Sequence, residues 1–352
     1  PLQPVLNNRI LEVTENTPLQ SEIALTYFAD GEPKVLSRTF PLTLYERHAM
    51  TWDRKEKIGA FVTPKDPAVA EFTRGIIQQY VDAYPALPSP LVYARALYDA
   101  LGVLELAYIV DPSSPFQEFS EKSSAVDYLQ YPRDTLARKS GDCDDLSVLF
   151  TAALENVGIN TALVDVPGHV FVIFNTGVEI DNKDSLGLPT NSVIAHRGTF
   201  WVPVEMTMVG ASFTKAWQRA ADEYLEWSAK GKTEIIELQK AWEQFRPVTL
   251  PPDSAKTILV KRDQIEAKYP GEIDALVQQR LELLSAAHLA ALGKDPNDTQ
   301  ALTGLGILYG EHGKYQEALE QFQKLLAKDQ RNALALNNAG NVYFLQERLD
   351  DA

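Results

Sequence analysis

The chain has a single cysteine, Cys143, and it lies where a thiol could become reactive. It stands in the acidic run GDCDD, and the helical pattern of apolar residues that follows places it in the first turn of a helix. The unpaired N–H groups and the positive dipole end at that position favour a thiolate. His169 lies in the strand-like run GHVFVIF, and Glu205 lies in the run WVPVEMT. A nucleophile, a base and an orienting acid on three elements form the arrangement that attack on an amide carbonyl requires.

The aspartates beside Cys143 can either raise the pKa of the thiol or stabilise the start of its helix. Their carboxylates would raise its pKa if they pointed at the sulfur, but residues one or two apart on a helix do not face each other. Asp142 is well placed as the N-cap, and acids in the first turn favour the helix dipole. We therefore predict Asp142 to cap the helix and one of these acids to hold a basic side chain such as Arg133 or Arg138.

Each of these residues also has a simpler explanation. A lone cysteine at a helix start is often a small buried residue, and a strand histidine is often only packed. The other histidines show no ligand-like spacing, so we predict no metal and no cofactor. The run 181–184 (DNKD) has the oxygen side chains of a calcium loop, but an Asx-rich turn explains it more simply.

The pattern of the elements predicts an α+β fold. Residues 1–60 read as a β segment, with Asp30-Gly31 as a hairpin turn between apolar runs. The following region, residues 61–250, combines helices with strand-like runs, and its last part from 214 to 245 reads as helical. The predicted elements between these limits are helices at 66–82, 91–104 and 142–157 and strands at 162–166, 170–174 and 200–204.

The third region, residues 251–352, contains a repeat. Four residues recur 34 positions later, pairing Leu302 with Leu336, Gly306 with Gly340, Tyr309 with Tyr343 and Ala318 with Ala352. This period and these residue types resemble tetratricopeptide repeats, with one copy at 299–332 and a partial copy at 333–352. Gly306 would let paired helices approach closely. Ala339 and Gln330 depart from the family pattern, which has a larger apolar residue and a proline at these places.

The middle region resembles the transglutaminase-like superfamily, whose members have a papain-like cysteine protease fold. The resemblance runs from about Phe61 to Phe213 and rests on three blocks in order, namely TLARKSGDCDDL, GHV and WVPVEMT. It implies that Cys143 is the nucleophile, His169 the general base and later acid, and Glu205 the residue that orients the imidazole. The family usually has Asp in place of Glu205, and many members have Trp near the position of Phe171.

The resemblance implies a thiol-dependent enzyme that acts on peptide or glutamine amide bonds through a thioester, and we favour a peptidase. Its repeats would recruit a protein partner or substrate. The alternative is a non-catalytic scaffold in which both the papain-like unit and the repeats bind protein partners. The resemblance also favours the periplasm or cell exterior of a bacterium.

Composition narrows the remaining possibilities. The net charge of −15 opposes binding to a phosphate backbone, so we predict no nucleic-acid partner. No apolar run approaches the roughly 20 residues of a membrane span. A length of 352 residues, with 45% hydrophobic and 23% charged residues, fits two or three globular domains. A single cysteine leaves the redox compartment open.

Overall fold

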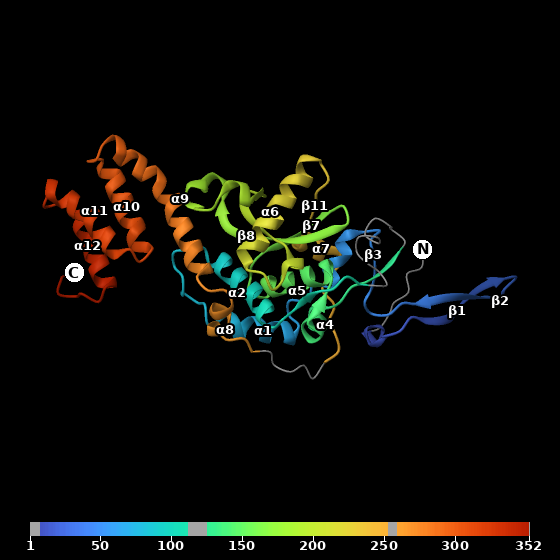
Figure 1. The fold of residues 1–352 in the computed structure, drawn as a ribbon. Helices are drawn as coiled ribbons and strands as arrows, with labels where there is room; N and C mark the ends of the chain where they lie inside the picture. Colours follow the sequence, from blue (N-terminus) through green and yellow to red (C-terminus); the bar gives the residue numbers. More distant parts are fainter. Residues whose placement is uncertain (1–7, 112–124, 253–258, 352) are drawn as a thin grey trace.

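A five-stranded antiparallel sheet and the helices on its two faces form the centre of the molecule (Figure 1). The structure is a computed structural model, and it describes residues 8–111, 125–252 and 259–351. The fold is mixed, with an antiparallel sheet and a helical C-terminal region, as the α+β prediction requires. The strand order is β11-β7-β8-β10-β9, formed by β7 (Thr161–Val166), β8 (His169–Glu179), β9 (Ile194–His196), β10 (Thr199–Val204) and β11 (Glu234–Glu237).

Alternation along β8 explains how this sheet is covered. Val170, Val172 and Phe174 pack on the side of helix α5 (Cys143–Asn156), whereas Phe171 and Ile173 pack on the side of α6 (Phe213–Ala229). Side chains along a strand point to alternate faces, so a continuous apolar run lets both faces be buried. The two helices therefore cover opposite faces of the sheet, and α6 supplies residues to the cavity described below.

Helix α5 is the most deeply buried helix of the central layer. Every residue from Cys143 to Leu154 is buried, because α1 (Pro67–Ile77), α2 (Ser89–Val103) and α4 (Pro132–Arg138) pack against α5 together with the sheet. The remaining short elements of this part are β3 (Ala49–Thr51), η2 (Lys55–Ala60), β4 (Ala107–Tyr108), β5 (Val126–Tyr128), β6 (Ser140–Gly141), η3 (Ile180–Ser185), η4 (Thr190–Ser192) and η5 (Met206–Met208).

The N-terminal β segment forms a long hairpin that projects from the body (Figure 1). It follows η1 (Asn8–Glu12) and consists of β1 (Thr17–Ala29) and β2 (Glu32–Leu44). The turn is the predicted one: Asp30 and Gly31 have φ of 57° and 82°, the left-handed pair that a two-residue hairpin turn needs. Most side chains of the hairpin are exposed, including Leu25 and Phe28.

The predicted helical stretch from 214 to 245 is wrong in its middle, between α6 (Phe213–Ala229) and α7 (Leu238–Gln244). Helix α6 ends at Ala229, and Gly231 with φ of 65° turns the chain back toward the sheet. Strand β11 then pairs with β7, and only afterwards does α7 (Leu238–Gln244) form. The β-branched pair Ile235-Ile236 takes part in a sheet edge, so long-range pairing overrides a local helical pattern.

The C-terminal region is helical and is tied to the body by buried charges. It contains α8 (Arg262–Lys268), α9 (Glu272–Lys294), α10 (Thr299–Glu311), α11 (Tyr315–Lys328) and α12 (Ala333–Leu345). Arg95 of α2 is fully buried and forms ion pairs with Asp99, Glu266 and Glu272 at 2.6, 2.8 and 3.5 Å. The ion pairs between buried Arg95 and the acids of α8 and α9 fix the start of the C-terminal region on the body.

The helix pair of the first repeat packs as its glycine predicts. A Cβ atom on Gly306 would lie 2.6 Å from the Phe322 ring, so α10 and α11 approach more closely than alanine would allow. Leu302, Ala318 and Phe322 are buried in one cluster. The predicted domain limits stay predictions, and the main core includes residues on both sides of them, from Met50 and Trp52 to Tyr269 and Leu276.

Candidate active site

Cys143 is the first residue of α5, as predicted, and a tight backbone arrangement leads into it. The preceding segment β6 pairs in parallel with β4, which fixes the approach to the helix. Asp142 occupies the N-cap position, and its backbone N–H donates to the Asp145 carboxylate at 3.3 Å. Gly141 has no room for a side chain, because a Cβ atom there would meet Asp145 at 2.5 Å. Cys143 is 3% exposed.

The Cys143 thiol lies against the beginning of β8. The backbone N–H of Val170 donates a hydrogen bond to the sulfur, so the thiol sits beside the residue that follows His169. This contact brings the first and second blocks of the sequence pattern together. It also gives the sulfur a donor that favours its charged form.

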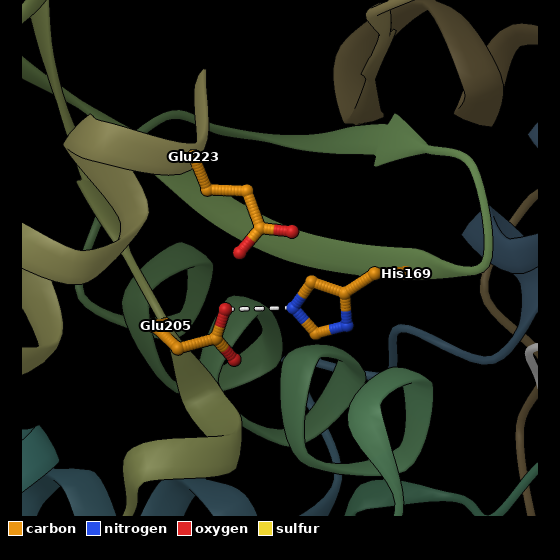
Figure 2. A group of neighbouring side chains, drawn as sticks. All are labelled: His169, Glu205 and Glu223. Carbon is orange, nitrogen blue, oxygen red and sulfur yellow. Dashed lines mark hydrogen bonds and ion pairs between the residues drawn. The ribbon is translucent and has the colours of Figure 1, made fainter. Parts of the chain in front are cut away.

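Figure 2 shows that Glu205 reaches His169 despite the extra methylene compared with aspartate. His169 Nε2 lies 2.6 Å from Glu205 Oε2. Glu205 is 2% exposed, and its other oxygen accepts hydrogen bonds from the Thr207 N–H and hydroxyl at 2.9 and 2.6 Å. The carboxylate is thus fixed on both oxygens, and Nδ1 of the imidazole lies on the side of the ring away from Glu205.

The two pKa shifts of this pair agree with an ion pair. Burial alone would lower the pKa of His169, but the hydrogen bond and the charge of Glu205 raise it above its ordinary value. Burial alone would raise the pKa of Glu205, but His169 and Thr207 lower it. The Glu205 carboxylate therefore stabilises the imidazolium form, which makes His169 a stronger base.

The electrostatics of the thiol differ from the sequence expectation. Burial, and then the charges of Asp144 and Asp142, raise the pKa of Cys143 well above its ordinary value, although the Val170 N–H opposes them. The helix position was expected to yield a thiolate, and the acids were expected to face elsewhere. Cys143, Asp144 and Asp145 are all buried, and this burial opposes the thiolate that the helix position favours.

The predicted basic partners of these acids are elsewhere. Arg133 binds Asp66, and Arg138 lies over the Tyr128 ring. Asp145 is held instead by Gln130, whose backbone N–H donates to it at 2.7 Å. Burial, followed by the charge of Asp142, raises the pKa of Asp145 to about 7. Burial and Asp142 also raise the pKa of Asp144.

A cavity of about 470 Å³ opens beside the histidine. Helix α6 lines it with a stripe of residues at four-residue spacing, Arg219, Glu223 and Trp227. Arg219 and Glu223 form an ion pair at 3.2 Å. The other lining residues are Tyr108, Pro167, Gly168, His169, Glu205 and Thr207. The sequence reasoning missed Tyr108 and Glu223. The helical pattern from 214 to 245 did not indicate that Glu223 faces His169.

Two groups of side chains have the composition to hold a cation. The ligand atoms of His169, Glu205 and Glu223 lie within 4.8 Å of one another, and so do those of Asp142, Asp144 and Asp145. The sequence prediction of no metal rested on histidine spacing and considered neither group. The run 181–184 forms part of η3, where Asp181 is exposed.

No protein-family model, no curated protein and no solved structure matches the chain. Within the described ranges, no helix combines the length and apolar character that crossing a membrane requires.

Proposed function

We propose that the protein is a thiol-dependent enzyme of the transglutaminase-like, papain-like kind, acting on peptide or glutamine amide bonds. Cys143 is the nucleophile, His169 the general base and Glu205 the residue that orients the imidazole. The observation that carries the proposal is the 2.6 Å contact between His169 Nε2 and a Glu205 carboxylate that Thr207 also fixes. The Val170 hydrogen bond to the sulfur supports the placement of the thiol beside this pair.

The geometry suggests how the proton moves. Because Nε2 is bound to Glu205, Nδ1 is the nitrogen that accepts the thiol proton. The thiolate then attacks the amide carbon, the amine leaves with a proton from His169, and a thioester remains on Cys143. Water attacks the thioester to complete hydrolysis, so a peptidase is the version we favour. The raised thiol pKa means that His169 removes the proton during attack rather than from a preformed ion pair.

Acylation of the thiol by p-nitrophenyl acetate tests this function. The wild type should release p-nitrophenol in a burst and carry an acetyl group on Cys143, detected by mass spectrometry, whereas Cys143→Ser should show neither. Peptide substrates and glutamine peptides with an added amine then separate hydrolysis from transfer. A wild type that is acetylated no faster than His169→Ala would contradict the proposal.

A scaffold remains the second candidate, because Cys143 is 3% exposed and the pKa of its thiol is raised. In that case the papain-like unit and the repeats would both bind protein partners. The helical repeats serve either function, since in the enzyme they would recruit a partner or substrate. The same acylation experiment separates the two functions.

A further inference from the structure

Tyr108 is placed by the backbone next to the segment that carries the nucleophile. Strand β4 pairs in parallel with β6, and Tyr108 stands opposite Gly141 in the register. The hydrogen bonds on either side, from Ala107 N–H to the Lys139 carbonyl and from Ile109 N–H to the Gly141 carbonyl, measure 3.0 and 2.9 Å. The backbone of Tyr108 is therefore fixed opposite Gly141, which precedes Cys143 by two residues.

The side chain of Tyr108 reaches the cavity rather than the core. It lines the same 470 Å³ cavity as His169 and Glu205 and is 37% exposed. Strand β4 also packs on η5, the turn that directly follows Glu205. The strand of Tyr108 thus contacts both the segment that leads into the nucleophile helix and the turn that follows Glu205.

The hydroxyl of Tyr108 is protonated at neutral pH and can donate a hydrogen bond. Burial, followed by the charge of Cys143, raises the pKa of Tyr108 to about 12, so the phenol keeps its proton at neutral pH. No hydrogen bond of this hydroxyl is formed within the described parts of the chain. A protonated phenol beside the nucleophile, with a free O–H and an open cavity in front of it, is suited to hold developing negative charge.

We propose that Tyr108 is a further catalytic residue, whose hydroxyl donates a hydrogen bond to the oxyanion formed when Cys143 attacks a carbonyl. This assignment rests on the proposed function. As the C–S bond forms, the π electrons of the carbonyl move onto its oxygen, and the Tyr108 O–H stabilises that charge. When the carbonyl re-forms, the C–N bond breaks and the amine takes a proton from His169, which leaves the thioester. Tyr108 keeps its own proton throughout.

Two reagents that attack the same thiol separate this role from thiol activation. p-Nitrophenyl acetate acylates Cys143 through an oxyanion, whereas iodoacetamide alkylates it by displacement at a carbon that never carries one. Cys143 is the only cysteine, so the labelled thiol is unambiguous. The variants are Tyr108→Phe, which removes only the hydroxyl, and Tyr45→Phe as a matched control at an exposed tyrosine outside the cavity. Cys143→Ser gives the background of acylation at other sites.

Tyr108→Phe should slow acylation at least about 10-fold, as loss of one oxyanion donor does, and should leave alkylation within about twofold of wild type. Tyr45→Phe should change neither rate. Unchanged acylation in Tyr108→Phe overturns the proposal while leaving the proposed function in place. An equal fall in both rates also overturns it, because Tyr108 would then act on the thiol or its base. If wild type and His169→Ala are alkylated equally slowly, the proposed function and this assignment both fail.

Discussion

The two sides of the candidate site, around His169 and around Cys143, differ in how their charges are arranged. On the base side, the His169 and Glu205 pair is complementary in charge, and Thr207 satisfies the remaining carboxylate oxygen. On the nucleophile side, the buried acids Asp142 and Asp144 flank Cys143 in the chain, and Arg133 and Arg138 make other contacts. The comparison teaches that the histidine side is ready to accept a proton, whereas the thiol side resists losing one.

Magnitudes explain why the helix position of Cys143 does not decide its pKa. A helix N-terminus is worth about 0.3–1 kcal/mol to a nearby anion. Full burial can shift a pKa by up to about 3–5 units, at about 1.4 kcal/mol per unit. Burial therefore outweighs the dipole, and the charges of Asp144 and Asp142 add to burial. In the proposed mechanism, activation of this thiol therefore depends on His169 more than on the helix.

The largest expected effect is loss of the charge on the base side. Glu205→Gln should lower the rate of acylation by p-nitrophenyl acetate about 10³-fold, because an amide stabilises neither the imidazolium nor its correct tautomer. The matched control is Glu223→Gln, which neutralises the other carboxylate near the ring and should cost less than about 10-fold. Equal losses in the two variants would show that the base side depends on total charge and not on the hydrogen bond.

A smaller change of opposite sign is expected on the nucleophile side. Asp142→Asn removes a charge that raises the Cys143 pKa, and asparagine remains a good N-cap. The pKa of the thiol should fall by about one unit, so alkylation by iodoacetamide at pH 8 should be about 3- to 10-fold faster. The exposed acid Asp222 of α6 serves as a control through Asp222→Asn, which should have no effect. A slower rate of alkylation in Asp142→Asn would contradict the inference that the Asp142 charge raises the pKa of the thiol.

The smallest expected effect is in stability against pH. The pKa of His169 is raised above 6.5 in the folded state, so its pair with Glu205 stabilises fully below pH 6.5. That stabilisation is lost as the pH rises through the folded-state value. The extra unfolding free energy of wild type over His169→Ala should therefore shrink by about 1.4 kcal/mol for each pH unit by which the pKa is raised.

His196 provides a control of opposite sign for this measurement. Burial lowers its pKa below 6.5, so the folded state resists its protonation and wild type should lose stability relative to His196→Ala as the pH falls through 6.5. Urea unfolding across pH 5 to 8 measures both variants. Parallel trends for the two histidines would contradict the base-side ion pair.

Local patterns predicted the parts of the fold that local chemistry fixes. The Asp30-Gly31 turn, the start of α5 and the strand that carries His169 all depend on neighbours in sequence. Strand β11 could not be predicted, because a partner 71 residues away in the chain decides its conformation, as the pairing of Ile235 with Val164 shows.

The sequence could not show which side chains point into the site. Sequence order indicated Cys143, His169 and Glu205, but the burial that raises the thiol pKa comes from helices packed on α5. Tyr108 enters the cavity only through the pairing of β4 with β6, and Glu223 only through the packing of α6 on the sheet. Such contacts carry no periodic signature, so sequence spacing alone leaves them out.

The pH dependence of Cys143 alkylation by iodoacetamide, in wild type and His169→Ala, tests the central claim most directly. The account predicts that the wild-type rate rises with an inflection above pH 6.5, where His169 becomes a base, and is at least about 10-fold faster at pH 8 than the variant. The variant should react appreciably only toward the thiol pKa, above 9. Superimposable, slow profiles of the two proteins would contradict a thiol activated by His169.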